Sequence, residues 1–261
     1  MKNSFILLLM ILAASCAKNS KVAFGPVYMG LNGKFSSVEI TNYTGPNEIT
    51  FKSKPLGDFV ETEVYTFDKS GYLSEKCTYT DPARKVLTAK DTYKRDKEGC
   101  LTETYSGFNL NDNDYSAESL WRRIEKAGNK EKWQKIDEND WWGTSYQEIE
   151  YSGNKKEIKD YVIQKQNGKT SVMDTITQIF NKRGLITSEV NSTHPTNTTI
   201  KTYNDKGYLL KEEIDQLMKD GSINKTVTES YTIDKVDEYG NPLQATDERG
   251  YVKIYKYTYI K

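Results

Sequence analysis

Long stretches of the chain alternate between apolar and polar residues with a period of two, which is the pattern of a β-strand with one buried face. These stretches are rich in Thr, Tyr, Val and Ile, residue types that are common in strands. They are VEITNYT, ITFKSK, TEVYTF, YVIQKQ, TSVMDTITQIF, TVTESYTI and YVKIYKYTYI. The pattern predicts an all-β fold.

A turn motif recurs between these stretches. In YTFDKSGYL and again in YKRDKEGCL, an Asp precedes a Gly by three positions. This spacing fits a three-residue hairpin connection, because Asp or Asn favours the first corner of a type I turn and Gly accepts the left-handed conformation that follows. The motif occurs five times, at Asp68 and Gly71, Asp96 and Gly99, Asn181 and Gly184, Asn204 and Gly207, and Asp237 and Gly240. Each copy predicts a β-hairpin corner.

The strands and corners together predict an antiparallel meander of successive β-hairpins, which forms one twisted sheet that is free to curve. The mean hydropathy of −0.76 is low for a globular protein. Nineteen tyrosines compensate, because a tyrosine ring can be buried while its hydroxyl stays in contact with water. These features favour a single-layer sheet with tyrosines on both faces, and a two-sheet sandwich remains the alternative.

One segment fits a helix better than a strand. In SAESLWRRIEKAG, Ser116 is a suitable N-cap, Leu120, Trp121 and Ile124 would share one helical face, and Gly128 would end the helix. The sequence therefore predicts one short helix, within an insertion at residues 109–143 that lacks the hairpin motif.

The motif of an aromatic residue, Asp or Asn, Gly and Leu resembles the YD repeat of RHS-type proteins. It is more closely similar to the short YD-like hairpin repeats of Bacteroidota envelope lipoproteins. The resemblance covers roughly residues 60–110 and 175–261. It implies an antiparallel sheet of hairpins that is anchored to the cell envelope. The long RHS proteins have many more copies, so the resemblance does not predict a closed shell here.

The N-terminus has the layout of a bacterial signal peptide. Residues 1–15 carry one Lys and then an apolar run that is too short to span a bilayer permanently. The small residues before Cys16 resemble a lipobox, in which Cys16 would become the lipidated first residue of the mature protein. The alternative is ordinary cleavage after Ala14 or Ser15, which would leave Cys16 as a thiol.

The segment at 16–24 then reads as a lipidated Cys and a short tether, and residues 25–261 as one YD-like hairpin domain. The tether contains no acidic cluster, and such a cluster would resemble the surface-export signal of lipoproteins in these bacteria. This favours an outer-membrane lipoprotein that faces the periplasm and is held in the membrane by its N-terminal lipid.

Composition narrows the possible partners. Lys plus Arg and Asp plus Glu both number 37, and the two signs are interspersed, so the sequence predicts no nucleic-acid partner. Cys77 and Cys100 are expected two strands apart, which favours two buried thiols over a disulfide. His194 is the only histidine, and no Cys/His spacing suggests a metal. We expect neither a metal nor a cofactor.

The insertion holds all four tryptophans of the chain, with several carboxylates between them. Exposed Trp beside carboxylates can bind sugars, so Trp133, Asp140, Trp141 and Trp142 are candidate ligand-binding residues. The alternative is that the tryptophans only pack the insertion onto the sheet. A glycoside hydrolase is the third reading, although the acids of one turn are poorly placed for its two catalytic roles.

These observations predict a lipid-anchored envelope protein that acts as a binding or scaffold module without catalysis, with no catalytic residues assigned. A carbohydrate- or peptidoglycan-binding lipoprotein is the alternative. The sequence identifies neither the glycan nor the envelope protein that would be bound.

Overall fold

A computed structural model describes residues 34–44, 57–108, 117–136 and 142–260. Within these ranges the chain forms sixteen β-strands and has no helix. The strands are β1 (Phe35–Tyr43), β2 (Phe59–Phe67), β3 (Leu73–Tyr79), β4 (Leu87–Arg95), β5 (Leu101–Phe108), β6 (Ala117–Ala127), β7 (Lys130–Ile136), β8 (Gly143–Ser152), β9 (Lys155–Gln164), β10 (Thr170–Phe180), β11 (Ile186–Asn191), β12 (Asn197–Tyr203), β13 (Leu209–Leu217), β14 (Ile223–Val236), β15 (Pro242–Asp247) and β16 (Val252–Tyr259).

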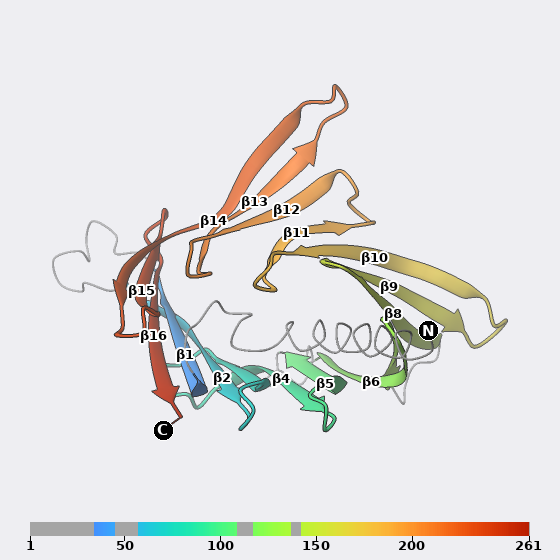
Figure 1. The fold of residues 1–261 in the computed structure, drawn as a ribbon, viewed down its shortest axis with the longest axis horizontal. Coiled ribbons are helices and arrows are strands. Elements are labelled where there is room, and N and C mark those ends of the chain that lie inside the picture. Colours follow the sequence, from blue (N-terminus) through green and yellow to red (C-terminus); the bar gives the residue numbers. More distant parts are fainter. Residues whose placement is uncertain (1–33, 45–56, 109–116, 137–141, 261) are drawn as a thin grey trace, which may run out of the picture.

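The sixteen strands close into one antiparallel barrel. Each strand pairs with its neighbours in the sequence, and β1 pairs with both β2 and β16. Figure 1 shows this seam, where β1 in blue lies beside β16 in red. Ser36 Oγ donates a hydrogen bond of 3.2 Å to the Thr258 carbonyl across the seam, between residues 222 positions apart.

The open twisted sheet expected from the sequence is therefore wrong. Hairpin signals are local, whereas closure depends on the pairing of the first strand with the last, which no local pattern encodes. The small number of turn motifs gave no indication of closure, because strands without the motif, such as β6 to β9, complete the circumference.

The helix expected after Ser116 is wrong as well. Residues 117–127 form β6, which pairs with β5 and β7, and Gly128 lies in the tight turn to β7 with a φ of +62°. Leu120 and Trp121 therefore point to opposite sides of the sheet instead of sharing a face. Two neighbouring strands supply backbone hydrogen bonds along this segment, and that tertiary context overrides its helical spacing.

The inward face of the barrel holds the core. Phe35, Val38 and Ile40 of β1 are buried in one cluster with Tyr208, which lies in the connection from β12 to β13. Because β13 is four strands away from β1 around the barrel, these side chains meet on the concave side. Tyr65, Tyr93, Ile233, Tyr255, Tyr257 and Tyr259 pack against this cluster.

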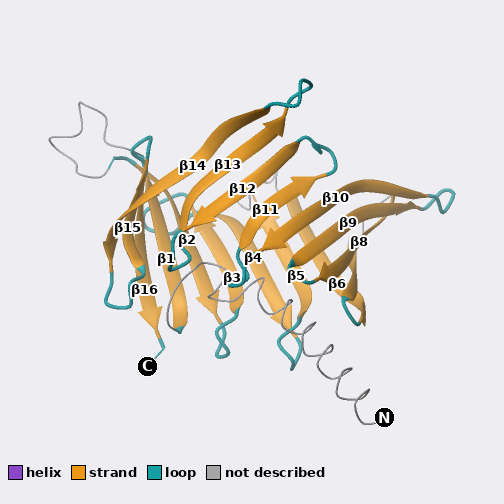
Figure 2. Cartoon of the chain, turned by 45° about the horizontal axis from the view of Figure 1, so that its top comes forward, coloured by secondary structure: helices purple, strands orange, loops and turns teal. Residues whose placement is uncertain are grey.

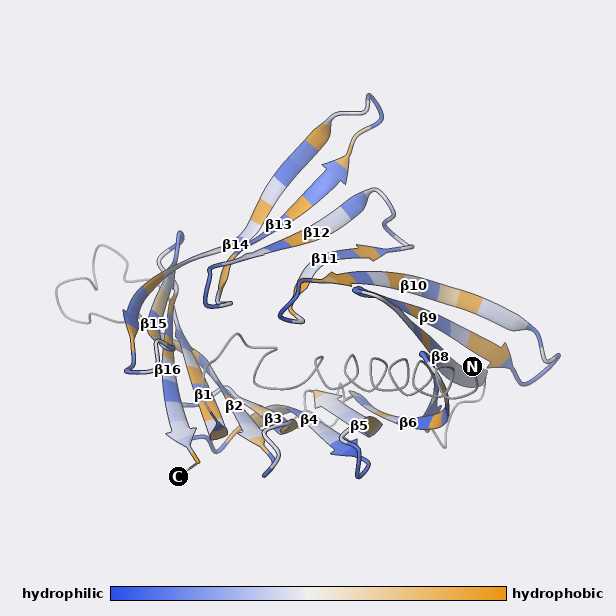
Figure 3. Ribbon diagram, in the orientation of Figure 1, coloured by the Kyte–Doolittle hydropathy of each residue, from blue (hydrophilic) through white to orange (hydrophobic). Residues whose placement is uncertain are grey.

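The outward face carries charged side chains among apolar ones such as Leu120 and Ile254. Glu39 lies between the inward Val38 and Ile40, and its carboxylate pairs with Lys256 at 3.1 Å. The same face carries ion pairs around the circumference, namely Lys90–Glu75, Arg122–Glu103, Lys130–Glu150, Lys155–Glu157 and Lys225–Asp215. Figure 3 shows hydrophilic positions mixed with hydrophobic ones along most strands.

The five turn motifs share one geometry. Asp68 Oδ1 accepts hydrogen bonds from the amides of Ser70 and Tyr72, at 2.8 and 3.0 Å. Asp96, Asn181, Asn204 and Asp237 accept the corresponding pairs of bonds. All five turns join an even-numbered strand to the next odd-numbered one, so they lie at the same end of the barrel, and Figure 2 shows the connections at both ends.

In four of the five turns the residue after the glycine is buried. Cys100, Leu185, Tyr208 and Asn241 are at most 3% exposed. Consecutive turns also contact one another, because a Cβ on Gly99 would lie 3.0 Å from the ring of Tyr72, which follows the previous turn. With a φ of +80°, Gly99 is required both by its backbone and by this neighbour.

Candidate functional site

The inward face forms a partly open cavity of about 250 Å³ between β1, β2 and strands β11 to β16. Tyrosine dominates its wall, and two lysines reach it. We call it the tyrosine-lined cavity, and its aromatic and basic side chains are Tyr65, Tyr203, Tyr208, Tyr231, Tyr255, Lys201 and Lys253.

Strand register brings these residues to one side of the sheet. Ile40 of β1 lies opposite Tyr255 of β16, and Lys253 lies two residues earlier on the same face. Lys253 in turn faces Ala245 of β15, and Ala245 faces Ile233 of β14. Because side chains alternate along a strand, the lining residues of β16 and of β14 are two positions apart, at Lys253 and Tyr255 and at Tyr231 and Ile233.

The tyrosine hydroxyls are fixed by hydrogen bonds. Tyr231 donates to Glu229 at 2.9 Å, Tyr203 to the Ile186 carbonyl at 2.8 Å, and Tyr208 to the Gly240 carbonyl at 2.5 Å. Burial, with the carboxylates of Glu63 and Glu229 adding to it, raises the pKa of Tyr255 to about 12. Burial and the bond to Glu229 also raise the pKa of Tyr231. The hydroxyls of Tyr231 and Tyr255 therefore stay protonated at physiological pH, and these two rings present uncharged faces to the cavity.

The charged groups near the cavity differ in how they are paired. Lys201 pairs with Glu212 at 2.8 Å and Lys76 with Glu63 at 2.5 Å. The ammonium of Lys253 instead lies 4.3 Å from the centre of the Tyr231 ring, as a cation–π contact. Among the described residues it has no carboxylate at ion-pair distance.

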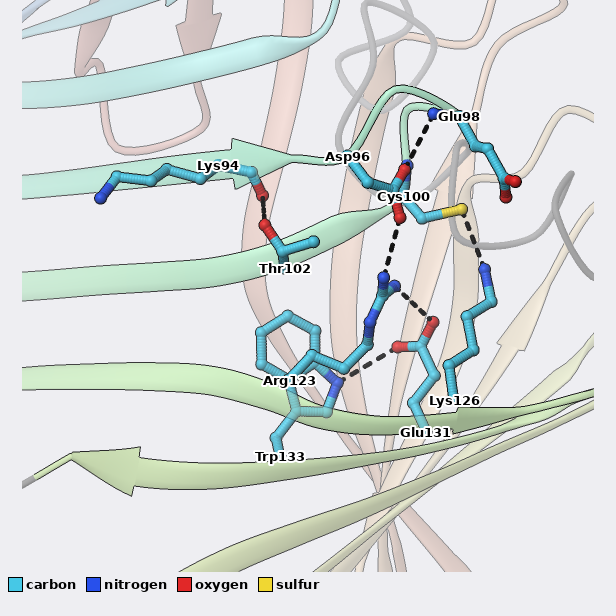
Figure 4. A network of polar contacts seen from close by, with 9 residues as sticks. All are labelled: Lys94, Asp96, Glu98, Cys100, Thr102, Arg123, Lys126, Glu131 and Trp133. Carbon is cyan, nitrogen blue, oxygen red and sulfur yellow. Dashed lines mark hydrogen bonds and ion pairs between the residues drawn. The ribbon is translucent and has the colours of Figure 1, made fainter.

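A second polar network lies on the inward face further around the barrel (Figure 4). Arg123 is held between Asp96, at 2.8 Å, and Glu131, at 3.5 Å. The indole of Trp133 donates to the other oxygen of Glu131 at 3.1 Å, and the Lys126 ammonium donates to the Cys100 sulfur at 3.0 Å. Each acid here has a donor, which is typical of a network that stabilises the fold.

The predicted ligand-binding tryptophans are only partly within the described residues. Trp133 is 4% exposed and packs with Leu101 and Ile149. Trp142, just before β8, is 39% exposed. Asp140 and Trp141 lie outside the described residues, as do the signal peptide at 1–15, Cys16 and the tether at 16–24. Of the predicted ligand-binding tryptophans that the structure describes, Trp133 is buried and Trp142 offers a surface to a ligand.

The two cysteines of the barrel lie where the sequence placed them. Cys77 is on β3 and Cys100 directly precedes β5, and both are buried thiols. No group of three or more metal-ligating side chains is found in the described part of the chain. That part also has no helix long and apolar enough to cross a membrane.

Sequence reasoning missed the tyrosine-lined cavity. The available signal was the alternation of tyrosines in YVKIYKYTYI, where Tyr255, Tyr257 and Tyr259 share one face. This face becomes a cavity wall only after β16 pairs with β1. The open sheet expected from the sequence has tyrosines on both faces and forms no cavity.

No protein-family model and no curated protein matches the chain. Among similar solved structures, a porin-like protein from Bacteroides uniformis is 12% identical with a TM-score of 0.35, over 85% of this chain and 97% of that one. A protein of unknown function from Bacteroides fragilis is 12% identical with a TM-score of 0.17, over 73% of this chain and 91% of that one. The TcdB2-TccC3-TEV structure is 9% identical with a TM-score of 0.23, over 74% of this chain and 12% of that one. At these values the likeness identifies no family.

Proposed function

We propose that this protein is a non-catalytic binding protein of the bacterial cell envelope and that the tyrosine-lined cavity is its binding site. The main support for the proposal is that the barrel is closed and that its inward face forms a cavity lined by five tyrosine rings. Concave sites with apolar and aromatic walls and a few polar groups are the usual small-molecule sites of proteins.

The charged side chains of the outward face support the proposal that water, and not lipid, surrounds the barrel. A barrel that spans a membrane exposes an apolar band to lipid, and Lys or Arg at the middle of that band costs about 2–4 kcal/mol each. Lys256, Lys130 and Arg122 point outward here, with side chains 75%, 65% and 53% exposed. Ion pairs around the circumference favour an aqueous surrounding.

The proposed location follows from the N-terminal sequence. We propose that a lipid on Cys16 anchors the protein to the outer membrane and that the barrel faces the periplasm. Mass spectrometry of the mature protein tests this proposal, because lipidation adds acyl chains to the peptide that begins at Cys16. An unmodified Cys16 would contradict it.

The pairing of the acids near the cavity supports binding without catalysis. Glu63 is paired with Lys76, Glu212 with Lys201, and Asp247 with Arg249. A general acid or base needs a carboxyl group that can exchange its proton with a substrate, and a carboxylate held by a cation is poorly suited to this role.

A glycan site at Trp133, Asp140, Trp141 and Trp142 is the weaker candidate. Trp133 is buried and donates its indole N–H to Glu131, so it has no free ring face for a sugar. Exposed Trp142 is the one observation in favour of that site.

A cavity-filling variant tests the binding site. Ala245 is 1% exposed and lines the cavity, so Ala245→Phe would place a ring inside it. Gln244→Phe is the matched control, because it adds the same ring one residue earlier, on the outward face. Both would be compared with the mature chain carrying Cys16→Ser, by ligand-observed NMR against a library of single-ring compounds, with circular dichroism to verify folding.

We expect saturable binding by the parent protein and by Gln244→Phe, with at least about a tenfold loss in Ala245→Phe. If Ala245→Phe does not fold, Ile40→Phe fills the cavity from β1, two strands away from β15. Equal binding by a folded cavity-filled variant, or no binding by the folded parent protein, would overturn the proposal.

A further inference from the structure

We infer that the tyrosine-lined cavity selects small ligands built on a single ring with one carboxylate, and that Lys253 holds the carboxylate. This inference rests on the proposed function, because it names the ligand class of the same site.

The position of Lys253 is the first argument. Its strand neighbour on the inward face is Tyr255, and its partner across the ladder is Ala245, both of which line the cavity. The lysine side chain therefore extends from the cavity wall. Its ammonium lies 4.3 Å from the centre of the Tyr231 ring, so one aromatic face already fixes where the charge sits.

The hydrogen-bonding capacity of Lys253 is the second argument. An ammonium has three donors, and a ring face satisfies none of them as an oxygen would. The other lysine of the cavity, Lys201, is held by Glu212 at 2.8 Å. Within the described residues, Lys253 is the cavity cation that has no carboxylate within 4.0 Å, so its donors are available to a ligand.

The acids around Lys253 do not take that place. Glu229 accepts the hydroxyl of Tyr231 at 2.9 Å, and Asp247 is held by Arg249 at 2.8 Å. Glu63 is held by Lys76. Each of these three acids has a partner other than Lys253. A ligand carboxylate would therefore be the partner of Lys253.

The size and wall of the cavity limit the rest of the ligand. A volume of about 250 Å³ lies just below the usual range of about 300–1,000 Å³ for ligand sites, which suits one ring with short substituents and not a polymer or a lipid chain. Tyrosine rings pack against flat or apolar ring faces. Sugar acids and aromatic acids share this chemistry, so the experiment includes both.

Matched acid and neutral pairs test the inference. The probes are glucuronate against glucose and phenylacetate against phenylacetamide, titrated into the mature chain with Cys16→Ser. Lys253→Met removes the charge and keeps most of the side-chain length. Lys256→Met is the matched control, because Lys256 lies on the same strand, points outward and pairs with Glu39.

We expect the parent protein and Lys256→Met to bind at least one acid about tenfold or more tightly than its neutral partner, since a charge-assisted hydrogen bond distinguishes the two. Lys253→Met should lose this preference and still bind the neutral compound. The pair that shows the effect identifies the source as a sugar acid or an aromatic acid.

Three results would overturn the inference. If Lys253→Met keeps the full preference for the acid, another group recognises the carboxylate. If the parent protein binds the acid and the neutral compound equally, the cavity binds rings without selecting charge, and the proposed function survives while this inference fails. If neither compound nor any library ligand binds, both fail together.

Discussion

Single residues determine the geometry of the turns, and the sequence was sufficient to predict where these turns occur along the chain. The spacing of Asp or Asn and Gly located five connections of the barrel, because that spacing reflects bonds within a few residues. The site residues were harder to find. The tryptophans attract attention because they cluster in the sequence, yet Trp133 is 4% exposed, while Tyr231 and Tyr255 come together only through β15 and β16.

Asp96 offers a test at this scale. Burial acts to raise the pKa of Asp96, but hydrogen bonds from the Cys100 amide and the Arg123 guanidinium outweigh it and hold the pKa below its ordinary value. A lowered carboxyl pKa stabilises the fold above the ordinary value of about 4, and this contribution disappears as the pH falls through the lowered value.

The substitution Asp96→Asn keeps the oxygen that accepts the turn amides, as Asn181 and Asn204 do in their turns, and removes the charge facing Arg123. We expect the free energy of unfolding to fall by about 1–2 kcal/mol near neutral pH and the difference from the parent protein to shrink below about pH 4. Urea unfolding at a series of pH values measures both. Glu98→Gln, in the same turn, is the control, and a pH-independent difference for Asp96→Asn would show that its charge has no such role.

Whole elements were predicted well where local pattern decides them and poorly where neighbours do. The alternation in TSVMDTITQIF and YVKIYKYTYI corresponds to β10 and β16. The spacing of apolar residues in SAESLWRRIEKAG fits a helix. The segment is nevertheless a strand, because β6 pairs with β5 and β7. A single chain segment does not contain that information.

The strand conformation of β6 predicts unequal effects for neighbouring residues. Trp121 packs inward with the cluster of Leu101, Trp133 and Ile149, and Leu120 lies on the outward face. We expect Trp121→Ala to lower the free energy of unfolding by about 2–4 kcal/mol and Leu120→Ala by about 1 kcal/mol. Urea unfolding of both variants measures the difference, and equal losses would favour the helix, in which the two residues share a face.

At the scale of the whole molecule, closure distinguishes this barrel from the open sheet that the sequence suggested. Closure places the tyrosines of β16 and β14 in the wall of the cavity. It also leaves the ion pairs of the outward face on the outside of the barrel. The proposed binding site and the proposed aqueous setting both depend on the seam between β1 and β16.

A disulfide across the seam tests the closure of the barrel most directly. Thr41 of β1 lies opposite Ile254 of β16 on the outward face, and Gln244 of β15 lies one strand further away. Neighbouring strands are about 5 Å apart, so cysteines at 41 and 254 are within disulfide reach and cysteines at 41 and 244 are not. After oxidation of the Thr41→Cys/Ile254→Cys protein, mass spectrometry should find an intramolecular link between these peptides, absent from the Thr41→Cys/Gln244→Cys control. A folded protein in which the first pair forms no intramolecular link would contradict the closed barrel.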